Sequence, residues 1–180
     1  MPLATTHILI AVILIELYRD FFVKNNKKFP RYYILIVALG SIIPDLDFAV
    51  YYFLSFFGFS INEIHRTYSH TIFIPLMLFF AGIFTYRFKI KNKVFGKKHL
   101  TLPMTFFIMT FGALLHLILD VTLSGIIMPV YPFFDYSAGL NLIEIFPLAW
   151  QDTILPVADA VLLMFWIFWM EFKLKIDNYF

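Results

Sequence analysis

Long apolar stretches alternate with short polar clusters along the whole chain. Residues 1–15 contain no Asp, Glu, Lys or Arg, and this apolar stretch continues to about Val23, before a basic cluster at 24–31. The later apolar stretches cover residues 32–59, 67–86, 100–124 and 153–170. A helix of about 20 apolar residues is long enough to cross a bilayer core of about 30 Å. The pattern predicts five transmembrane helices.

Two segments interrupt this regular pattern. The second apolar stretch contains Pro44-Asp45-Leu46-Asp47, and proline removes a helical hydrogen bond, so we expect a broken second helix with an extended Asp-Leu-Asp turn. Residues 126–152 contain Pro129, Pro132, Gly139 and Pro147, which predicts a re-entrant or interfacial loop before the last helix. The chain is therefore expected to be an all-α, polytopic integral membrane helical bundle, with a single domain over residues 1–180.

The composition agrees with a membrane protein. Hydrophobic residues make up 61% of the 180 residues and charged residues 14%, against about 25% charged in soluble domains. A soluble chain of this length cannot bury so much apolar surface, and an aromatic content of 21% excludes disorder. The absence of Cys excludes a disulfide scaffold and a cysteine-based zinc finger.

The positive charges predict the orientation. Lys and Arg are enriched in cytoplasmic loops of membrane proteins. With five spans, the segments 24–31 and 87–98 and the C-terminal tail fall on one side and carry twelve of the fourteen cations. We expect the N-terminus outside the cell membrane and the C-terminus in the cytoplasm. The cation run at 87–98 is interpreted as a solvated loop facing lipid headgroups, and not as a nucleic-acid site.

Histidines and aspartates lie in or beside the apolar stretches. A charge inside a span costs roughly 2.5–3.5 kcal/mol and is a functional hypothesis by default. These residues are His7, Asp45, Asp47, His65, His70, His116, Asp120 and Asp159. Counted back from the cytoplasmic cations at about 1.5 Å per residue, five of them reach one level, about 21–26 Å from that face. This shared depth predicts one site in the outer half of the bilayer.

The residue types suit a metal centre. His116 and Asp120 are four residues apart, so both project from one face of a helix. Imidazoles mixed with carboxylates favour zinc, manganese or iron over calcium. The predicted ligands are His7, Asp45, Asp47, His65, His70, His116 and Asp120. This set exceeds the three or four ligands of one zinc ion and predicts two divalent ions, zinc or manganese. Arg66 is positioned to bind an anionic group such as phosphate.

Each residue also has a simpler explanation. His7 fits an interfacial histidine, and His65 and His70 fit a solvated loop. The Asp45–Asp47 pair and Asp159 fit helix caps. His116 and Asp120 fit a pair of side chains on one helix that bond within the bundle. All of these explanations would have to hold at one depth, which favours a shared site. A serine nucleophile is a weaker alternative, because Ser69 and His70 are adjacent, Ser41 has no evident base and no Gly-x-Ser-x-Gly elbow is present.

The order of these motifs resembles the membrane-bound metal-dependent hydrolase family, also described as LexA-binding, inner-membrane-associated hydrolases. The resemblance covers residues 7 to about 133, and some members also carry an aspartate that matches Asp159. It is carried by Thr6-His7, Pro44-Asp45-Leu46-Asp47, His65-Arg66-Thr67-Tyr68-Ser69-His70-Thr71, His116-Leu117-Ile118-Leu119-Asp120 and Tyr131-Pro132-Phe133. The chain departs from the family pattern at Thr67, where glycine is usual, and has Ser69 and Thr71 where threonine and serine are usual.

The resemblance implies a metal-dependent hydrolase. We expect a metal-activated water, with Asp47 or Asp159 as general base and Arg66 holding the anionic group of the substrate. A site in the outer leaflet with two metals predicts a phosphoester of a lipid or lipid-linked substrate, as for a phospholipase or a lipid phosphatase. The alternatives are a metal-ion transporter and a metal-stapled regulatory membrane protein without hydrolytic activity.

Overall fold

The computed structural model describes residues 4–23, 29–61, 65, 68–88, 101–123 and 125–174. The helices are α1 (Ala4–Tyr18), α2 (Tyr32–Ile42), α3 (Asp47–Ser55), α5 (Phe73–Arg87), α6 (Leu102–Leu123) and α7 (Leu148–Trp169). Short 3-10 turns cover Ile43–Leu46 and Leu142–Ile145, and π-helical turns extend α1 over Arg19–Val23 and α7 over Met170–Leu174. The β-structure of the described ranges consists of isolated bridge residues, among them Ile127 paired with Ala138. The predicted all-α class is confirmed.

Three helical segments are long and apolar enough to cross a membrane. They are Tyr32–Ser55, which comprises α2 and α3, Leu102–Leu123 and Leu148–Lys173. They match the predicted second, fourth and fifth spans. Helix α5 is apolar but shorter, and α1 with its π-helical turn carries Glu16, Arg19 and Asp20 near its end.

The predicted bounds of two spans are wrong. The apolar stretch 67–86 is not one helix, because α5 begins only at Phe73. Thr71 Oγ1 donates to the Tyr68 carbonyl at 3.0 Å and closes a turn ahead of it, and Pro75 lies in the first turn of the helix, where a missing N–H costs nothing. The last helix begins at Leu148, earlier than the predicted 153, directly after Pro147.

The second span is broken at the predicted place but in another way. Residues 43–46 form a 3-10 turn with Pro44 at its start, where we expected an extended Asp-Leu-Asp turn. Pro44 cannot donate a backbone hydrogen bond, but its fixed φ suits the first turn of a helix, so the chain tightens and continues as α3. Leu46 points to the outside, with 57% of its surface exposed.

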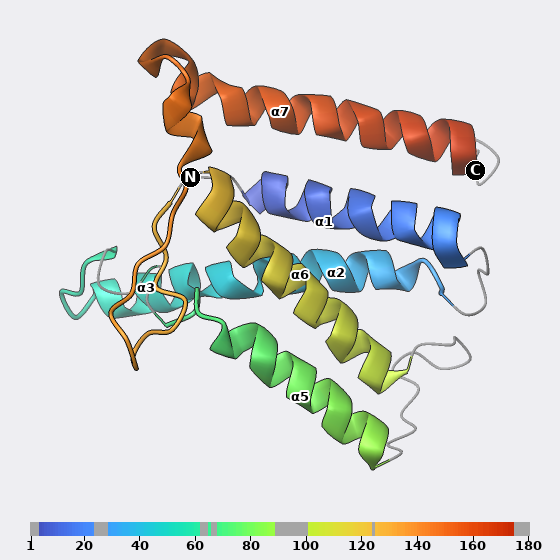
Figure 1. Ribbon diagram of the computed structural model, residues 1–180, viewed down its shortest axis with the longest axis horizontal. Helices are drawn as coiled ribbons and strands as arrows, with labels where there is room; N and C mark the ends of the chain where they lie inside the picture. Colours follow the sequence, from blue (N-terminus) through green and yellow to red (C-terminus); the bar gives the residue numbers. More distant parts are fainter. Residues whose placement is uncertain are drawn as a thin grey trace.

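Helix α6 crosses the middle of the bundle, between α1 and α5 and in front of α2 in Figure 1. It packs along α2 and α5, while α1 packs against α2 and α7. Helix α7 lies at the edge, and Leu155 and Asp159 are its buried residues. The helix ends that carry Arg19, Arg87 and Lys173 lie on the same side of the bundle, opposite α3 and the 125–147 segment (Figure 1).

Glycines bring the backbones of α2 and α6 into contact. A Cβ atom at Gly112 would lie 2.6 Å from the Val37 carbonyl oxygen and 2.7 Å from the Ser41 nitrogen. A Cβ atom at Gly40 would lie 2.6 Å from the Met109 carbonyl oxygen. Small residues allow this close approach of membrane helices. The pair therefore sets Ser41 of α2 beside the turn of α6 that follows Gly112.

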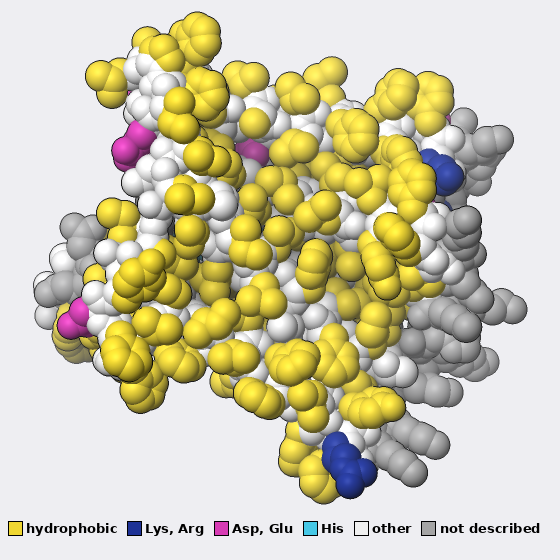
Figure 2. All heavy atoms as spheres, viewed as in Figure 1, with side chains coloured by type: hydrophobic (Ala, Val, Ile, Leu, Met, Phe, Trp, Pro, Cys, Tyr) yellow, Lys and Arg dark blue, Asp and Glu magenta, His cyan; other side chains and the backbone are white. Residues whose placement is uncertain are grey.

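The outer surface is mostly apolar. Figure 2 shows hydrophobic side chains over most of the described face, with most of the visible acidic side chains toward the α3 end and Lys and Arg at the opposite ends of the helices. Phe22 and Phe56 are 77% and 88% exposed. Such a surface suits contact with lipid, because apolar side chains that face lipid tails are not exposed to water.

Candidate metal centre

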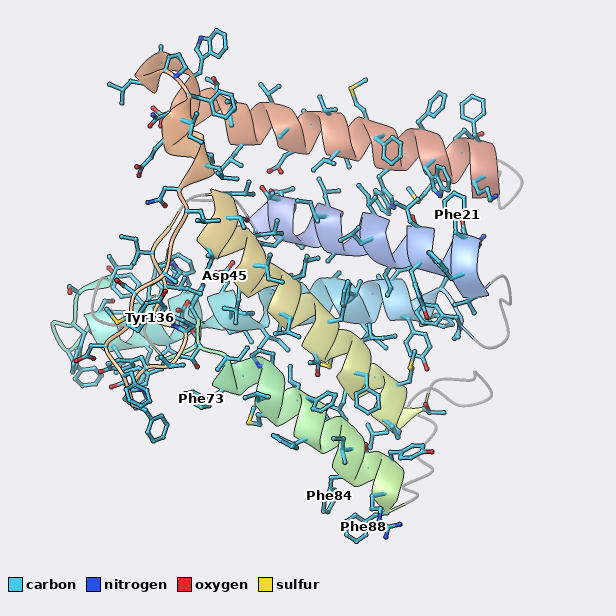
Figure 3. The ribbon with its side chains drawn as sticks, viewed as in Figure 1. Phe21, Asp45, Phe73, Phe84, Phe88 and Tyr136 are labelled. Atoms are coloured by element: carbon cyan, nitrogen blue, oxygen red, sulfur yellow. The ribbon has the colours of Figure 1, made fainter. Side chains whose placement is uncertain are left out.

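The predicted metal ligands converge at one end of the bundle. His7 comes from the first turn of α1, Asp45 and Asp47 from the break between α2 and α3, and His116 and Asp120 from α6. His65 and His70 come from the segment before α5. The histidines and aspartates form three overlapping groups, namely His7 with His116 and Asp120, Asp45 with His70 and His116, and Asp47 with His65 and His70. Figure 3 shows Asp45 on the inner side of the break, toward α6.

The end of α2 fixes the orientation of His116. The last four carbonyls of an α-helix have no partner within it, and α2 ends at Ile42. The Ser41 carbonyl is one of these and accepts a hydrogen bond from His116 Nδ1 at 2.7 Å. The proton of a neutral His116 therefore resides on Nδ1, and Nε2 presents a lone pair to the centre of the bundle.

Ser69 fixes the orientation of the His70 ring in the same way. Its hydroxyl donates to Asp47 Oδ2 at 2.6 Å, so the oxygen is free to accept from His70 Nδ1, which lies 3.1 Å away. His70 Nε2 then also presents a lone pair, 3.2 Å from His116 Nε2. Both imidazoles are fully buried. The sequence prediction did not assign this role to Ser69.

Two carboxylates complete a compact group of four donor atoms. Asp45 Oδ1 lies 3.4 Å from His70 Nε2 and 3.5 Å from His116 Nε2. Asp120 Oδ2 lies 3.3 Å and 3.4 Å from the same two nitrogens. Lone pairs and negative charge repel one another at such distances in a buried site, so a cation among them would stabilise the arrangement.

The spacing of each carboxylate oxygen from the two imidazole nitrogens suits ligands of one metal ion. Ligands at 2.0–2.2 Å from a tetrahedral zinc ion lie about 3.3–3.6 Å from one another. Asp45 Oδ1 and Asp120 Oδ2 each form a triangle with the two imidazole nitrogens, and the sides of these triangles are 3.2–3.5 Å. The donor set of two imidazoles and two carboxylates also suits zinc or manganese. The residues present therefore fit a divalent metal.

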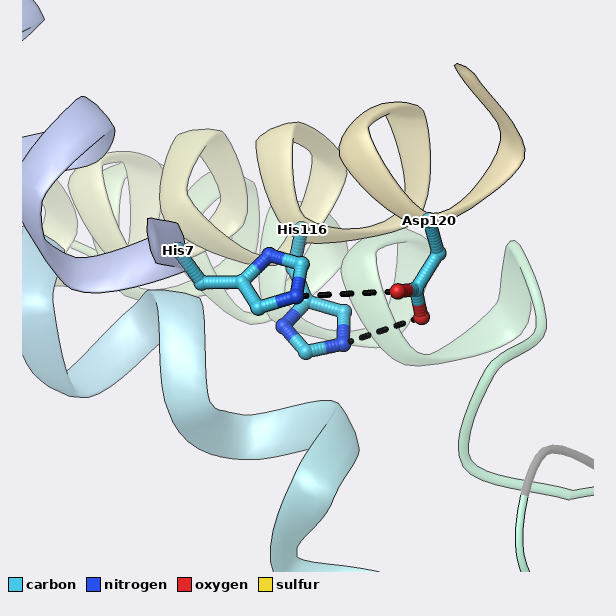
Figure 4. A group of neighbouring side chains, drawn as sticks. All are labelled: His7, His116 and Asp120. Carbon is cyan, nitrogen blue, oxygen red and sulfur yellow. Dashed lines mark ion pairs between the residues drawn. The ribbon is translucent and has the colours of Figure 1, made fainter. Parts of the chain in front are cut away.

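Asp120 faces two neighbours with its two oxygens. Its Oδ1 lies 3.6 Å from His7 Nε2, while its Oδ2 faces His116 (Figure 4). The His7 ring stacks on the His116 ring, with centroids 3.8 Å apart. Asp120 therefore faces His116 with one carboxylate oxygen and His7 with the other, so it could contribute to a metal site with either histidine.

Asp47 and His65 form the third group, on the far side of the His70 ring. His65 Nδ1 lies 3.0 Å from Asp47 Oδ1 and 3.1 Å from Asp47 Oδ2, and His70 Nδ1 lies 3.3 Å from Asp47 Oδ2. Asp47 is buried. It is the first residue of α3, and Leu46 stands at the N-cap position.

Arg66 and Asp159 were also predicted as site residues. Arg66 and its neighbour Thr67 fall outside the described residues, so the anion-binding role of Arg66 stays a prediction. Asp159 is buried in the middle of α7 and belongs to none of the three groups found among the described residues. Because α7 runs unbroken through Pro156, Asp159 does not cap a helix.

The 125–147 segment closes this end of the bundle. Pro129 accepts a hydrogen bond from the Ile72 nitrogen at 2.8 Å, and Val121 accepts one from the Leu140 nitrogen at 2.6 Å. Tyr131 meets Tyr68, whose hydroxyl lies 3.4 Å from its own, and this hydrogen bond raises the pKa of Tyr131 above its ordinary value. The segment thereby holds the start of α5 against the end of α6.

An apolar pocket of about 230 Å³ lies between α6, the turn before α5 and the 125–147 segment. Its lining is Ile72, Leu114, Leu117, Ile118, Val121, Thr122, Ile127 and Pro129. Leu117 and Val121 directly follow His116 and Asp120 along α6, and Ile72 lies two residues after His70. The pocket and the metal-ligand groups therefore share the same helix and the same turn.

Comparison with known proteins identifies the family but no closer relative. Searches of curated proteins and of solved structures find no match to this chain. The sequence profile described as YdjM inner membrane protein matches residues 1–175, nearly the full length. The match includes every histidine and aspartate of the three groups. The chain belongs to the YdjM inner membrane protein family, the family of membrane-bound metal-dependent hydrolases that its motifs resemble.

Proposed function

We propose that this protein is an integral-membrane, metal-dependent hydrolase that cleaves a phosphoester of a lipid or lipid-linked substrate. The observation that carries the proposal is the convergence of His70, His116, Asp45 and Asp120 at 3.2–3.5 Å. A bound divalent ion supplies a water of lowered pKa and polarises the oxygen of the scissile bond. Family membership supports the same class of reaction.

The chain's own residues would orient the reaction. The Ser41 carbonyl and the Ser69–Asp47 pair hold the two central imidazoles with Nε2 toward the metal. Asp47 faces His65 and His70 from outside the four-donor group, which suits the predicted general base. Arg66 would hold the anionic group of the substrate, and its neighbour His65 belongs to the third group.

The proposed membrane topology has five spans with the metal centre near the outer leaflet. Helix α1 with its π-helical turn and α5 with the preceding turn would be the two spans beyond the three long apolar helices. Arg19, Arg31, Arg87 and Lys173 lie at helix ends away from the centre. By the positive-inside rule those ends face the cytoplasm.

A hydrolase test uses the purified full-length protein in detergent micelles. We expect metal-stripped protein to be inactive toward lipid phosphomonoesters and phosphodiesters, and activity to return on addition of Zn²⁺ or Mn²⁺. Released phosphate and released headgroup are measured separately, which distinguishes a phosphatase from a phospholipase. Zinc binding without turnover of any phosphoester would favour the metal-stapled regulatory protein, and zinc uptake into vesicles would favour the transporter.

The apolar pocket supports a lipid substrate, and we predict that it holds an acyl chain. In Val121→Phe, a larger side chain fills the pocket, so kcat/KM for a long-chain lipid phosphoester should fall about tenfold. Hydrolysis of water-soluble p-nitrophenyl phosphate should stay unchanged. Val157→Phe on the exposed side of α7 is the matched control. Equal losses with both substrates would contradict the pocket's role.

A further inference from the structure

Asp159 is a buried carboxylate that the groups described above do not use. It is 7% exposed, and neither of its carboxylate oxygens has a hydrogen-bond partner among the described residues. An unpaired carboxylate removed from water is strongly unfavourable in a folded protein. Its burial therefore calls for a specific partner.

Two unsatisfied polar atoms lie in the first turn of α1. These are the Thr6 hydroxyl oxygen and His7 Nδ1, both buried and without a hydrogen-bond partner in the described part of the chain. The opposite nitrogen of His7, Nε2, faces Asp120. Helix α7 packs against α1, so these atoms and Asp159 belong to the same helix pair.

The register of the two helices places these atoms at one level. Trp166 Nε1 of α7 donates to Glu16 Oε2 of α1 at 2.8 Å, and the two helices run in the same direction (Figure 1). Asp159 lies two turns before Trp166, and Leu9 lies two turns before Glu16. Asp159 is thus level with Leu9, and only about 3 Å along the axis from His7.

We propose that Asp159 is a positioning residue for His7. Its carboxylate accepts from His7 Nδ1–H through one bridging water molecule, and its other oxygen is reached by the Thr6 hydroxyl in the same way. His7 Nε2 then presents its lone pair beside Asp120 as a metal ligand. This inference rests on the metal centre proposed above.

The same arrangement recurs at the two central histidines. Each has one nitrogen in the four-donor group and the other bonded to an oxygen, from Ser41 for His116 and from Ser69 for His70. Outer oxygen partners of this kind fix the tautomer of a ligating histidine, and their loss typically weakens metal binding 10–100-fold. Asp159 gives His7 the partner that it otherwise lacks.

Two substitutions separate this role from a purely structural one. In Asp159→Asn and Asp159→Leu, Zn²⁺ binding to metal-stripped full-length protein, measured by competition with a chromophoric chelator, should weaken about 10–100-fold. The thermal unfolding midpoint of zinc-free Asp159→Asn should stay near that of the wild type, because the amide oxygen can still accept from His7, whereas that of zinc-free Asp159→Leu should fall, because His7 Nδ1 and the Thr6 hydroxyl lose their partner. Asp152→Asn, at an exposed position of α7, should change neither quantity.

The coupling to His7 is tested by a double substitution. If Asp159 acts through His7, the double variant His7→Ala/Asp159→Asn should bind Zn²⁺ no more weakly than His7→Ala alone. Additive losses would overturn the proposal, as would wild-type zinc affinity in Asp159→Asn. A wild-type protein that binds no zinc would overturn the metal centre itself, which is a separate result.

Discussion

Replacement of His116 by alanine is expected to abolish metal binding and hydrolysis together. His116 Nε2 is 3.2–3.5 Å from three other donors of the central group, and its ring stacks on His7. Loss of an outer partner alone costs 10–100-fold in metal affinity, so loss of this ligand should cost more than about 100-fold in Zn²⁺ affinity. Metal content by elemental analysis and turnover of the lipid phosphoester are measured on the same preparation.

The control for this substitution is His99→Ala. His99 is the histidine outside the predicted ligand set and belongs to the predicted basic loop, so its replacement removes an imidazole but no predicted ligand. It should retain wild-type metal content and activity. A His116→Ala protein that hydrolyses the substrate without bound metal would refute the mechanism.

Substitution of Gly112 by alanine is expected to destabilise the protein by about 1–3 kcal/mol. The new Cβ atom would meet backbone atoms of Val37 and Ser41, and these cannot rotate away as a side chain can. The two helices must separate, which also moves the Ser41 carbonyl from His116 one turn later on α6. Thermal unfolding of the zinc-free protein and its Zn²⁺ affinity should therefore both decline.

Gly82→Ala is the matched control for Gly112→Ala. A Cβ atom at Gly82 would also be crowded, but by the ring of Phe107, which can change its rotamer. Both substitutions bring the same gain in helix propensity, so the difference between them isolates the backbone contact. Equal stability and equal zinc affinity of the two variants would show that the contact between α2 and α6 does not position His116.

Counting residues along apolar stretches predicted which polar residues share a depth, but depth is only one coordinate. His7, Asp45, His70 and His116 meet at one end of the bundle. Asp159 was predicted at the same level, and its register beside Leu9 agrees with that level, yet it belongs to the edge helix α7. The order of helices around the bundle depends on packing, for which the apolar pattern contains no signal.

The sequence pattern gave little or no signal for the partner of His116, the start of α5 and the contact between α2 and α6. The partner of His116 is a backbone carbonyl, which every residue possesses, so no side-chain motif reveals it. Apolar composition does not separate a turn from a helix, and the stretch 67–86 was therefore predicted as one span although α5 begins at Phe73. The glycines at 40 and 112 could have suggested a close helix contact, since small residues permit it.

The position of α7 at the edge of the bundle affects the order in which the protein can be completed during synthesis. All seven histidines and aspartates of the three groups lie between residues 7 and 120, and α7 begins at Leu148. Domains are built from the N-terminus as the chain emerges. The ribosome therefore synthesises all seven of these residues before it begins α7. The last helix then packs against helices that already contain every proposed metal ligand.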